Sequence, residues 1–436
     1  MRTHFNSICL SALLAAWASS ASAEQFTTLY NFTGGADGAY PAIGLLRAAD
    51  GTLYGTTEGE DAKGNFGTVF RLIPPVTEGG NWTKDNLYNF AGGKDGAFPW
   101  TRPIFDMETG ALLGTTAGTN RNPGTVFRLV PGAHGALPWT HQIIHRFSGG
   151  ADSGYPYSAL VQDPSNGAVY GTTYGETTKT DYGSIFGFAP DTKHKKWTSV
   201  MSYDFTAQPN TGAYPEAGLT LGPAGTLYGT TTGGGVDSGN CVVGDGVPGC
   251  GTIFSVNLAS RAVTILYEPF GAEGDGIFYP YGQLLADDQF NLYGATPGYS
   301  TRGCKMKGYL CGTAFSFNPD SGKPAKTIAI LTGKETSGES YAGLTWDITH
   351  TVLFGTASFG GTNNCPSVGK HKGCGFVFKL VQDGNRWFMT VVHEFTGGAD
   401  GAKPHDLVID SEGALYGEAE FGGTNDVGTI FKIENP

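Results

Sequence analysis

Short apolar runs alternate with polar turns along the whole chain, and no stretch of helical length repeats its apolar residues every 3.6 positions. A typical unit contains four such runs, each rich in β-branched and aromatic residues and bounded by Gly, Pro, Asn or Asp. In the first unit the runs begin at Pro41, Leu53, Gly67 and Asp85. These features are typical of strands and tight turns, so the pattern predicts an all-β chain with four strands per unit.

The unit recurs seven times at a nearly constant interval. Its most recognisable part is a pentad, and a Gly-Thr-Val-Phe-like tetrad follows each pentad after a loop. The pentads are LYGTT from Leu53, LLGTT from Leu112, VYGTT from Val169, LYGTT from Leu227, LYGAT from Leu292, LFGTA from Leu353 and LYGEA from Leu415. Successive pentads start 59, 57, 58, 65, 61 and 62 residues apart. This spacing predicts one architecture built seven times.

Seven units of four strands predict a seven-bladed β-propeller that forms one domain, residues 24–436. An open β-solenoid is the alternative, but its coils are shorter than about 60 residues and rarely contain four distinct strands. The run Phe26–Phe32 precedes the first unit, and the last unit ends at Ile433 without a fourth run. We expect the N-terminal run to complete the last blade, which would close the ring and remove the open sheet edges between the chain ends.

The linked motifs Phe-x-Gly-Gly-x-Asp-Gly-x-x-Pro, Leu-Tyr-Gly-Thr-Thr and Gly-Thr-Val-Phe resemble the GloVer tandem repeat of bacterial secreted choice-of-anchor proteins. The resemblance extends from about Phe26 to Ile433. It implies an exported protein with a propeller-like body, and no well-established biochemical activity comes with it. Members of that family often end in an anchoring tail. This chain ends at Pro436, directly after the last repeat, so we expect no anchor here.

The first 23 residues, Met1–Ala23, have a basic start, an apolar stretch and a small-residue site before Glu24. This pattern predicts a cleavable signal peptide, a secreted or periplasmic protein and no membrane insertion. Cys9 leaves with the signal, and six cysteines remain in three local pairs. The pairs are Cys241 with Cys250, Cys304 with Cys311, and Cys365 with Cys374. We expect three disulfides that wall one rim of the ring; a zinc site is the alternative, but a matching histidine set is missing.

Charge narrows the range of partners. Without the signal peptide the chain has 26 basic and 39 acidic residues, a net charge of −13. Such a surface repels phosphate backbones and anionic membranes, so we expect no nucleic-acid partner, while neutral or cationic partners remain open. Aspartates recur in the Gly-Gly-x-Asp-Gly loops, at Asp37, Asp95, Asp152 and Asp400. One carboxylate per blade favours a local turn over a calcium site, and we expect no metal or cofactor.

A candidate site comes from the residues on either side of the proline in each unit. The residue before it is nearly constant: Tyr40, Phe98, Tyr155, Tyr214 and Tyr279 in the first five copies, which indicates packing between blades. The residue after it varies: Ala42, Trp100, Tyr157, Glu216, Tyr281, then Tyr341 by alignment, then His405. A loose similarity to kelch-type blades implies that this post-proline run is the innermost strand. The varying residues would then form a ring at the channel mouth, although they could instead simply plug the channel.

The ring suggests a function, because aromatic faces stack on sugars and a few polar groups orient the hydroxyls. The leading interpretation is therefore a secreted protein that recognises an extracellular or cell-surface carbohydrate. A polysaccharide lyase or glycoside hydrolase is the first alternative, with His405, Glu216 and Glu418 as candidate acid–base residues. A structural or adhesive scaffold for a protein partner is the second. No nucleophile elbow, HExxH motif, P-loop or dinucleotide motif is present.

Overall fold

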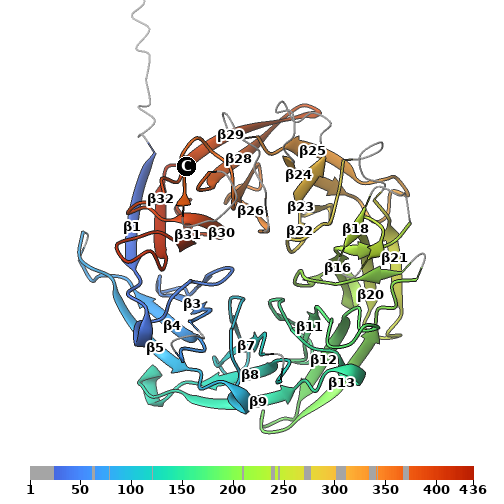
Figure 1. Ribbon diagram of the computed structural model, residues 1–436, viewed down its shortest axis with the longest axis horizontal. Coiled ribbons are helices and arrows are strands. Elements are labelled where there is room, and N and C mark those ends of the chain that lie inside the picture. Colours follow the sequence, from blue (N-terminus) through green and yellow to red (C-terminus); the bar gives the residue numbers. More distant parts are fainter. Residues whose placement is uncertain are drawn as a thin grey trace, which may run out of the picture.

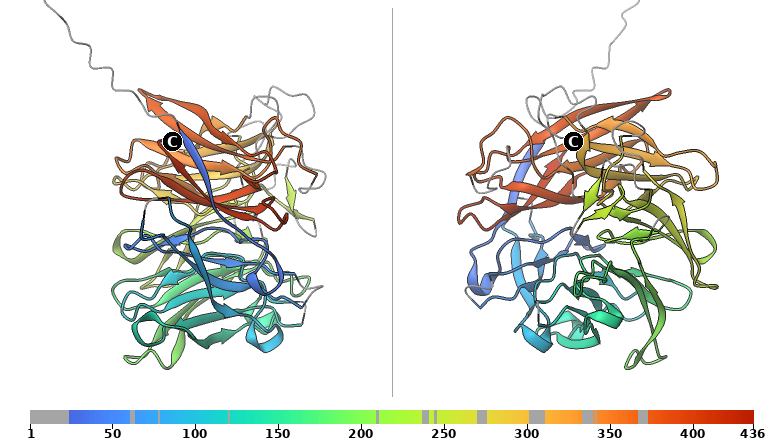
Figure 2. Two further views of the ribbon diagram at one scale, coloured as in Figure 1. Left: turned by 90° about the vertical axis from the view of Figure 1, so that its left-hand side faces the viewer. Right: turned by 45° about the vertical axis from the view of Figure 1, so that its right-hand side comes forward.

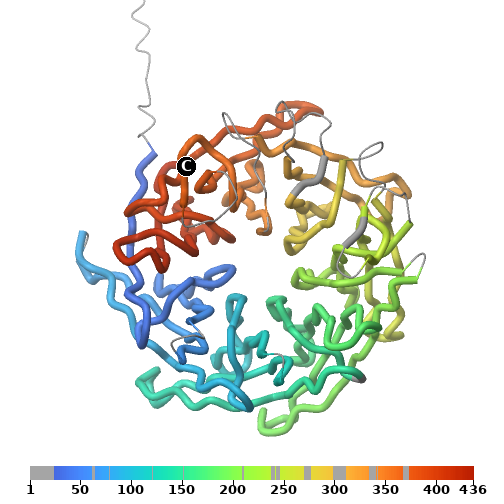
Figure 3. The backbone as a smooth tube through the Cα atoms, viewed as in Figure 1, coloured from blue at the N-terminus to red at the C-terminus, as the bar shows by residue number. Residues whose placement is uncertain are grey.

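The computed structural model describes residues 24–60, 64–77, 79–119, 121–208, 211–236, 241–243, 246–269, 276–300, 311–332, 340, 342–366 and 373–436. These residues form seven four-stranded antiparallel sheets that are arranged as a ring, a seven-bladed β-propeller (Figure 1). The chain passes once around the ring from its N-terminal to its C-terminal end (Figure 3). The predicted signal peptide and the cysteine Cys304 lie outside the described residues.

Each blade is one meander whose strands run from the centre of the ring to its outside. Blade one contains β2 (Leu46–Arg47), β3 (Leu53–Thr57), β4 (Thr68–Ile73) and β5 (Thr83–Asn89). Blade two contains β6 (Ile104–Phe105), β7 (Leu112–Thr116), β8 (Thr125–Val130) and β9 (Thr140–Arg146). Blade three contains β10 (Val161–Gln162), β11 (Val169–Thr173), β12 (Ser184–Pro190) and β13 (Trp197–Asp204).

The other four blades follow the same order. Blade four contains β15 (Thr220–Leu221), β16 (Thr226–Thr231), β20 (Thr252–Asn257) and β21 (Val263–Tyr267). Blade five contains β22 (Leu285–Ala286), β23 (Leu292–Ser300), β24 (Cys311–Phe317) and β25 (Lys326–Ile330). Blade six contains β26 (Leu344–Trp346), β27 (Val352–Ala357), β28 (Phe376–Asp383) and β29 (Arg386–Glu394). Blade seven contains β30 (Ala402–Ile409), β31 (Leu415–Phe421), β32 (Thr429–Glu434) and β1 (Gln25–Asn31).

The ring is closed by the first strand of the chain. Strand β1 lies antiparallel to β32 as the outer strand of blade seven, with Phe26 opposite Ile433 and Asn31 opposite Thr429. The side views show it beside the strands at the other end of the chain (Figure 2). The predicted closure by the N-terminal run is therefore confirmed.

The glycine of the pentad has a packing role in every blade. The phenylalanine of the following tetrad lies across it, and a Cβ atom at Gly114 would lie 2.6 Å from Cζ of Phe127. The same contact recurs between Gly55 and Phe70. Both phenylalanines are fully buried, so each blade places one aromatic ring where only a glycine leaves room for it.

The pentad threonines hold strands and blades together. The hydroxyl of the second threonine lies 2.9 Å from the tetrad hydroxyl on the neighbouring strand, as between Thr57 and Thr68. The hydroxyl of the first threonine donates to a carbonyl of the next blade, as from Thr56 to Thr101 at 3.1 Å. The pentad threonines are therefore strand residues whose hydroxyls link neighbouring strands and blades.

A proline and a glycine form the joint between neighbouring blades. Cδ of Pro99 would lie 2.5 Å from a Cβ atom at Gly67, the tetrad glycine of the preceding blade. The residue before the proline has a positive φ although it is not glycine, 58° at Phe98 and 57° at Tyr40. Its N–H donates to the preceding blade, from Phe98 to the Phe66 carbonyl at 2.9 Å. The expected packing between blades is therefore confirmed, and it involves a strained backbone.

The post-proline run differs from its prediction in blades one to five. Only its last residues form the innermost strand, and β2 begins at Leu46 rather than at Pro41. In blade one, Pro41 and Ala42 pair with β3 of the same blade, opposite Thr57 and Thr56, while the next residue bonds to the neighbouring blade. Ile43 pairs with the next blade, donating to the Trp100 carbonyl at 3.0 Å and accepting from Arg102 at 2.9 Å. In blade seven the run lies within β30.

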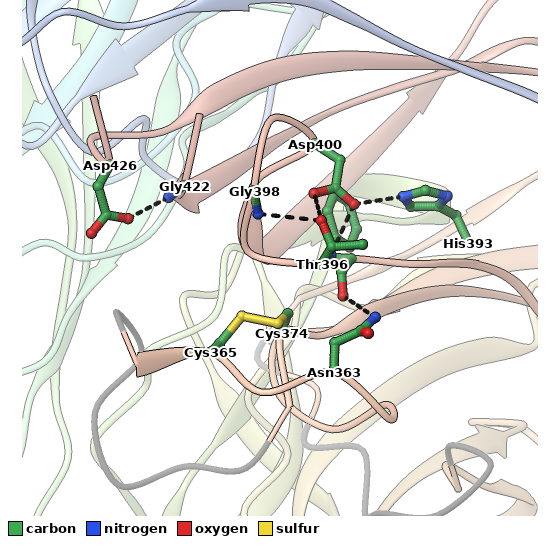
Figure 4. Close-up of a disulfide and its surroundings, with 10 residues drawn as sticks. Asn363, Cys365, Cys374, His393, Thr396, Gly398, Asp400, Gly422 and Asp426 are labelled. Carbon is green, nitrogen blue, oxygen red and sulfur yellow. Dashed lines mark hydrogen bonds and ion pairs between the residues drawn. A yellow bond between two sulfur atoms is a disulfide. The ribbon is translucent and has the colours of Figure 1, made fainter. Parts of the chain in front are cut away.

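The recurring aspartates stabilise turns. In the last loop Asp400 accepts the backbone N–H of Thr396 at 2.8 Å and contacts His393 at 3.3 Å (Figure 4). The equivalent Asp37 and Asp95 accept backbone N–H groups four residues earlier, at 2.9 and 2.8 Å. The predicted turn role of these carboxylates is therefore confirmed.

Candidate functional site

A cavity of about 410 Å³ lies at one end of the channel, where blades one, two, five, six and seven meet. The post-proline residues Trp100, Tyr281 and His405 line it. So do Glu58, Lys403 and Glu420, while Phe359 and the segment 41–43 supply apolar surface. The cavity therefore combines aromatic faces with a small set of ionisable groups, as ligand sites usually do.

A narrower cavity of about 40 Å³ continues from the mouth into the channel. It shares Ile43, Trp100 and Tyr281 with the mouth cavity, and Tyr157 and Glu216 line it as well. The indole of Trp100 stacks on Tyr157 with ring centroids 4.6 Å apart. Six of the seven residues of the expected ring thus line these two cavities, and the seventh, Tyr341, lies outside the described residues.

The strained joint explains how these side chains reach the cavities. Lys403, which precedes the proline of blade seven, has φ of 57°, and its N–H donates to the Cys374 carbonyl at 2.8 Å. The left-handed residue and the fixed φ of proline turn the chain sharply, so the next residue faces the ring axis. His405 follows this turn and is 4% exposed.

Lys403, His405 and Glu420 form one charged cluster. Nε2 of His405 lies 2.9 Å from Oε2 of Glu420, and Nζ of Lys403 lies 2.5 Å from the same oxygen. Burial raises the pKa of Glu420, but the hydrogen bond and charge of His405, together with the charge of Lys403, outweigh it and lower the pKa overall. Glu420 is therefore a carboxylate that binds both basic groups of the mouth.

Glu58 lies in the same cavity but has the opposite electrostatics. The side chain is half-buried, and its pKa is raised to about 7. Burial is the main cause, and the negative charge of Glu420 adds to it. The indole N–H of Trp100 and the charge of Lys403 reduce this rise. Two neighbouring carboxyls in one cavity thus have pKa values shifted in opposite directions.

Glu216 is a second carboxyl with a pKa of about 7, and burial is the main cause. It accepts a hydrogen bond from the Thr232 hydroxyl at 3.1 Å. Hydrogen bonds from Tyr281 and Thr232 lower the pKa, while the charge of Glu176 raises it. Tyr281 therefore faces the mouth cavity and also holds the Glu216 carboxyl beneath it.

Glu418, the third candidate acid–base residue, lies elsewhere. It is fully buried, and Oε1 accepts the backbone N–H of Gly44 across the junction between blades seven and one. It occupies the place of the pentad threonine that bonds to the next blade. Burial raises its pKa well above the usual range. Glu418 lines neither cavity, so the structure separates it from His405 and Glu216.

Two of the predicted disulfides are present, Cys241–Cys250 and Cys365–Cys374; the third pair includes Cys304, outside the described residues. The expected disulfide wall does not border the cavities, because no described cysteine lines them. The Cys365–Cys374 bond instead packs under the loop that contains Gly397 and Asp400 (Figure 4). The Cys374 and Cys250 carbonyls accept the N–H groups of Lys403 and Tyr279, so the bonds brace the inter-blade joints.

Sequence reasoning missed Glu58 and the charged role of Lys403 in this site. A signal for Glu58 exists at the position directly after the pentad. That position varies around the ring: Glu58, Ala117, Tyr174, Thr232, Pro297, Ser358 and Glu420. It forms a second ring of variable residues beside the post-proline ring. In the described part of the chain, no three His, Cys, Asp or Glu side chains form a group that could hold a metal ion.

The repeat identifies the family of the chain. The Gloeobacter/Verrucomicrobia repeat model matches residues 17–243, more than half of the 436 residues. The chain belongs to this family. No curated protein matches the sequence of this Gloeobacter/Verrucomicrobia repeat protein.

Solved structures confirm the fold of this repeat protein but show no close relative. The extracellular domain of a hybrid two-component system from B. thetaiotaomicron has 14% identity and a TM-score of 0.53, over 95% of this chain and 42% of that one. This chain therefore spans less than half of that structure's length. An oligogalacturonate lyase from Vibrio parahaemolyticus has 10% identity and a TM-score of 0.50, over 95% and 97% of the two chains.

Two further observations concern the environment of the protein. Among the described residues, no helix has the length and apolar composition needed to cross a bilayer. The two disulfides indicate an oxidising compartment outside the cytoplasm, since thiols in the cytoplasm are kept reduced.

Proposed function

We propose that this repeat protein is exported and binds an oligosaccharide in the mouth cavity. The observation that carries the proposal is the composition of that cavity. Trp100 and Tyr281 supply ring faces from blades two and five, and carboxyls and an imidazole from blades one and seven lie beside them. Sugar rings stack their C–H faces on aromatic rings, while hydroxyls need hydrogen-bond partners at fixed positions. A cavity of about 410 Å³ accommodates one to two sugar units.

A glycan array followed by calorimetry on the purified mature chain tests this proposal. We expect at least one family of oligosaccharides to bind, and Tyr281→Ala to weaken that binding. Absence of binding to every glycan class on the array would contradict the proposal. Binding that Tyr281→Ala leaves unchanged would place the site elsewhere.

A second candidate function is hydrolysis of a glycosidic bond, and one observation favours it. Glu58 retains a proton near neutral pH, whereas Glu420 in the same cavity is ionised. Glu58 would donate its proton to the glycosidic oxygen, and Glu420 would accept a proton from the water that attacks the anomeric carbon. One C–O bond breaks and one forms, giving a new reducing end and an alcohol.

A lyase is less well supported, because it must neutralise the carboxylate of its substrate. Lys403 already binds Glu420. An assay for new reducing ends and for unsaturated products distinguishes the two reactions. Glu58→Gln should abolish the hydrolytic product while the variant still binds oligosaccharide measurably. Unsaturated products would contradict hydrolysis, and binding without any product would leave recognition as the function.

A further inference from the structure

The mouth cavity contains more hydrogen-bond acceptors and negative charge than its own residues satisfy. Its basic groups are Lys403 and His405, and both contact Oε2 of Glu420. Within the described residues, Glu58 has no ion-pair partner. Arg121 lines an adjoining cavity that also borders Glu58, and these two residues form no ion pair. In the described part of the chain, the Glu58 carboxyl therefore faces the cavity without an ion pair, although the charge of Lys403 lowers its pKa.

Glu216 repeats this arrangement below Trp100 and Tyr281. Its described partners are hydroxyl groups, from Thr232 and Tyr281. The charged group that acts on it is another carboxylate, Glu176. The raised pKa values of Glu58 and Glu216 are the expected consequence of burying a carboxyl without a cationic partner.

His405 supplies an independent sign that a ligand is accommodated here. It is 4% exposed, lines the mouth cavity, and Nε2 bonds to Glu420. Its other nitrogen, Nδ1, is buried without a hydrogen-bond partner among the described residues. In the neutral tautomer whose Nε2–H donates to Glu420, Nδ1 is an acceptor. A buried acceptor without a donor is costly, so a donor from a ligand would complete it.

The ring faces fit the same kind of ligand. Trp100 and Tyr281 border both cavities, the one that Glu58 lines and the one that Glu216 lines. Aromatic faces attract cations as well as sugar C–H groups, and the attraction is strongest at desolvated sites. Unbalanced carboxyls, an unpaired acceptor and aromatic faces together favour a donor-rich ligand that carries positive charge.

We propose that the mouth cavity and the narrower cavity next to it select oligosaccharides that carry primary amines, with Glu58 in the first and Glu216 in the second receiving the ligand ammonium groups. The inference rests on the proposed carbohydrate binding and adds the chemical class of the ligand. It separates this site from one for uronic acids, since those ligands would place a further carboxylate beside Glu58 and Glu420.

Three tetrasaccharides serve as probes in calorimetry at pH 7 and low salt. They are the tetramer of β-1,4-linked glucosamine, the same tetramer fully N-acetylated, and a tetramer of galacturonic acid. We expect the glucosamine tetramer to bind about tenfold more tightly than the N-acetylated one, the usual effect of one charge-assisted hydrogen bond. Raising the salt concentration to 0.5 M should reduce this preference only partly, because buried charge pairs are screened less than exposed ones. These comparisons use the unmodified protein and need no variant.

Two variants then assign the effect to the carboxyls. Glu58→Gln and Glu216→Gln should each reduce the preference for the amine without lowering the melting temperature. Glu412→Gln is the matched control, because Glu412 is exposed on a turn and lines neither cavity. Its preference should equal that of the unmodified protein.

The outcomes separate this inference from the proposed function. Equal affinity for the amine and the acetamide, or tighter binding of galacturonic acid, would overturn the amine selectivity and leave carbohydrate binding standing. Failure of all three probes, together with a negative glycan array, would overturn both. Unchanged selectivity in both Gln variants would also overturn the assignment to Glu58 and Glu216.

Discussion

Gly428 of the last repeat lies directly against Pro41 of the first, and a Cβ atom at Gly428 would lie 2.3 Å from Cδ of Pro41. This is the closing member of the series of glycine–proline joints. Gly428 has φ of 102°, a conformation that side chains rarely adopt. The two ends of the repeat array therefore meet through the same contact that joins neighbouring blades.

Gly428→Ala should destabilise the ring by about 2–4 kcal/mol, through backbone strain and through overlap with Pro41. Gly413→Ala is the matched control, because Gly413 has φ of 89° and open space around its Cα. It should cost only about 1 kcal/mol, from strain alone. Urea unfolding of both variants measures the difference. Equal losses would show that the joint tolerates a methyl group.

The stability of the protein should depend on pH through Glu58. Its pKa rises from 4.5 to about 7 on folding, so its stabilising contribution is full below about pH 4.5 and is lost as the pH rises through 7. Glu58→Gln removes this dependence. Relative to the unmodified chain, the variant should gain about 1–3 kcal/mol between pH 5 and pH 8. Urea unfolding at the two pH values tests this, and a constant difference would contradict the raised pKa.

The disulfides should matter for ligand binding as well as for stability. The backbone carbonyl of Cys374 accepts the N–H of Lys403, and Lys403 lies two residues before His405 in the chain. Replacing Cys365 and Cys374 together by serine should lower stability by about 2–3 kcal/mol, the scale for a short closed loop. It should also weaken oligosaccharide binding, because the joint that places His405 is loosened. Calorimetry on folded protein checks the second effect; unchanged affinity would limit the disulfide to a stabilising role.

Trp100→Ala should weaken oligosaccharide binding by about 1–3 kcal/mol, the scale of burying a large side chain against a partner. The fold should persist, since Trp100 is half-buried at the channel mouth. Phe388→Ala is the control, because Phe388 is 54% exposed on the outer strand of blade six. Loss of folding in Trp100→Ala, with unchanged affinity per folded molecule, would make Trp100 a core residue.

The sequence predicted the architecture well, because the features that define it are local and repeated. The pentad, the tetrad and the surplus run Phe26–Phe32 together imply seven blades and a closing strand. It also predicted the post-proline ring, because Trp100 and His405 differ from their counterparts at a position that is otherwise equivalent. Repeats make such differences visible in a single sequence.

The partners within the site were not predictable in the same way. The shift of Glu58 depends on Glu420, which lies in another blade and comes 362 residues later in the chain. Glu418 and Glu420 look alike in the sequence and, two residues apart in β31, share a face of the strand, yet one bonds across the blade junction and the other lines the cavity. Only the closed ring brings the first and last repeats together.

The glycine–proline joints carry a consequence for how such a protein changes over generations. The contacts that hold the ring together use the residues before and at each proline, whereas the residue after it faces the channel. In the described blades, the residue after the proline is therefore a position that the glycine–proline joint does not use. Substitutions at these positions can accumulate one at a time and change the ligand preference of the protein while its scaffold stays the same.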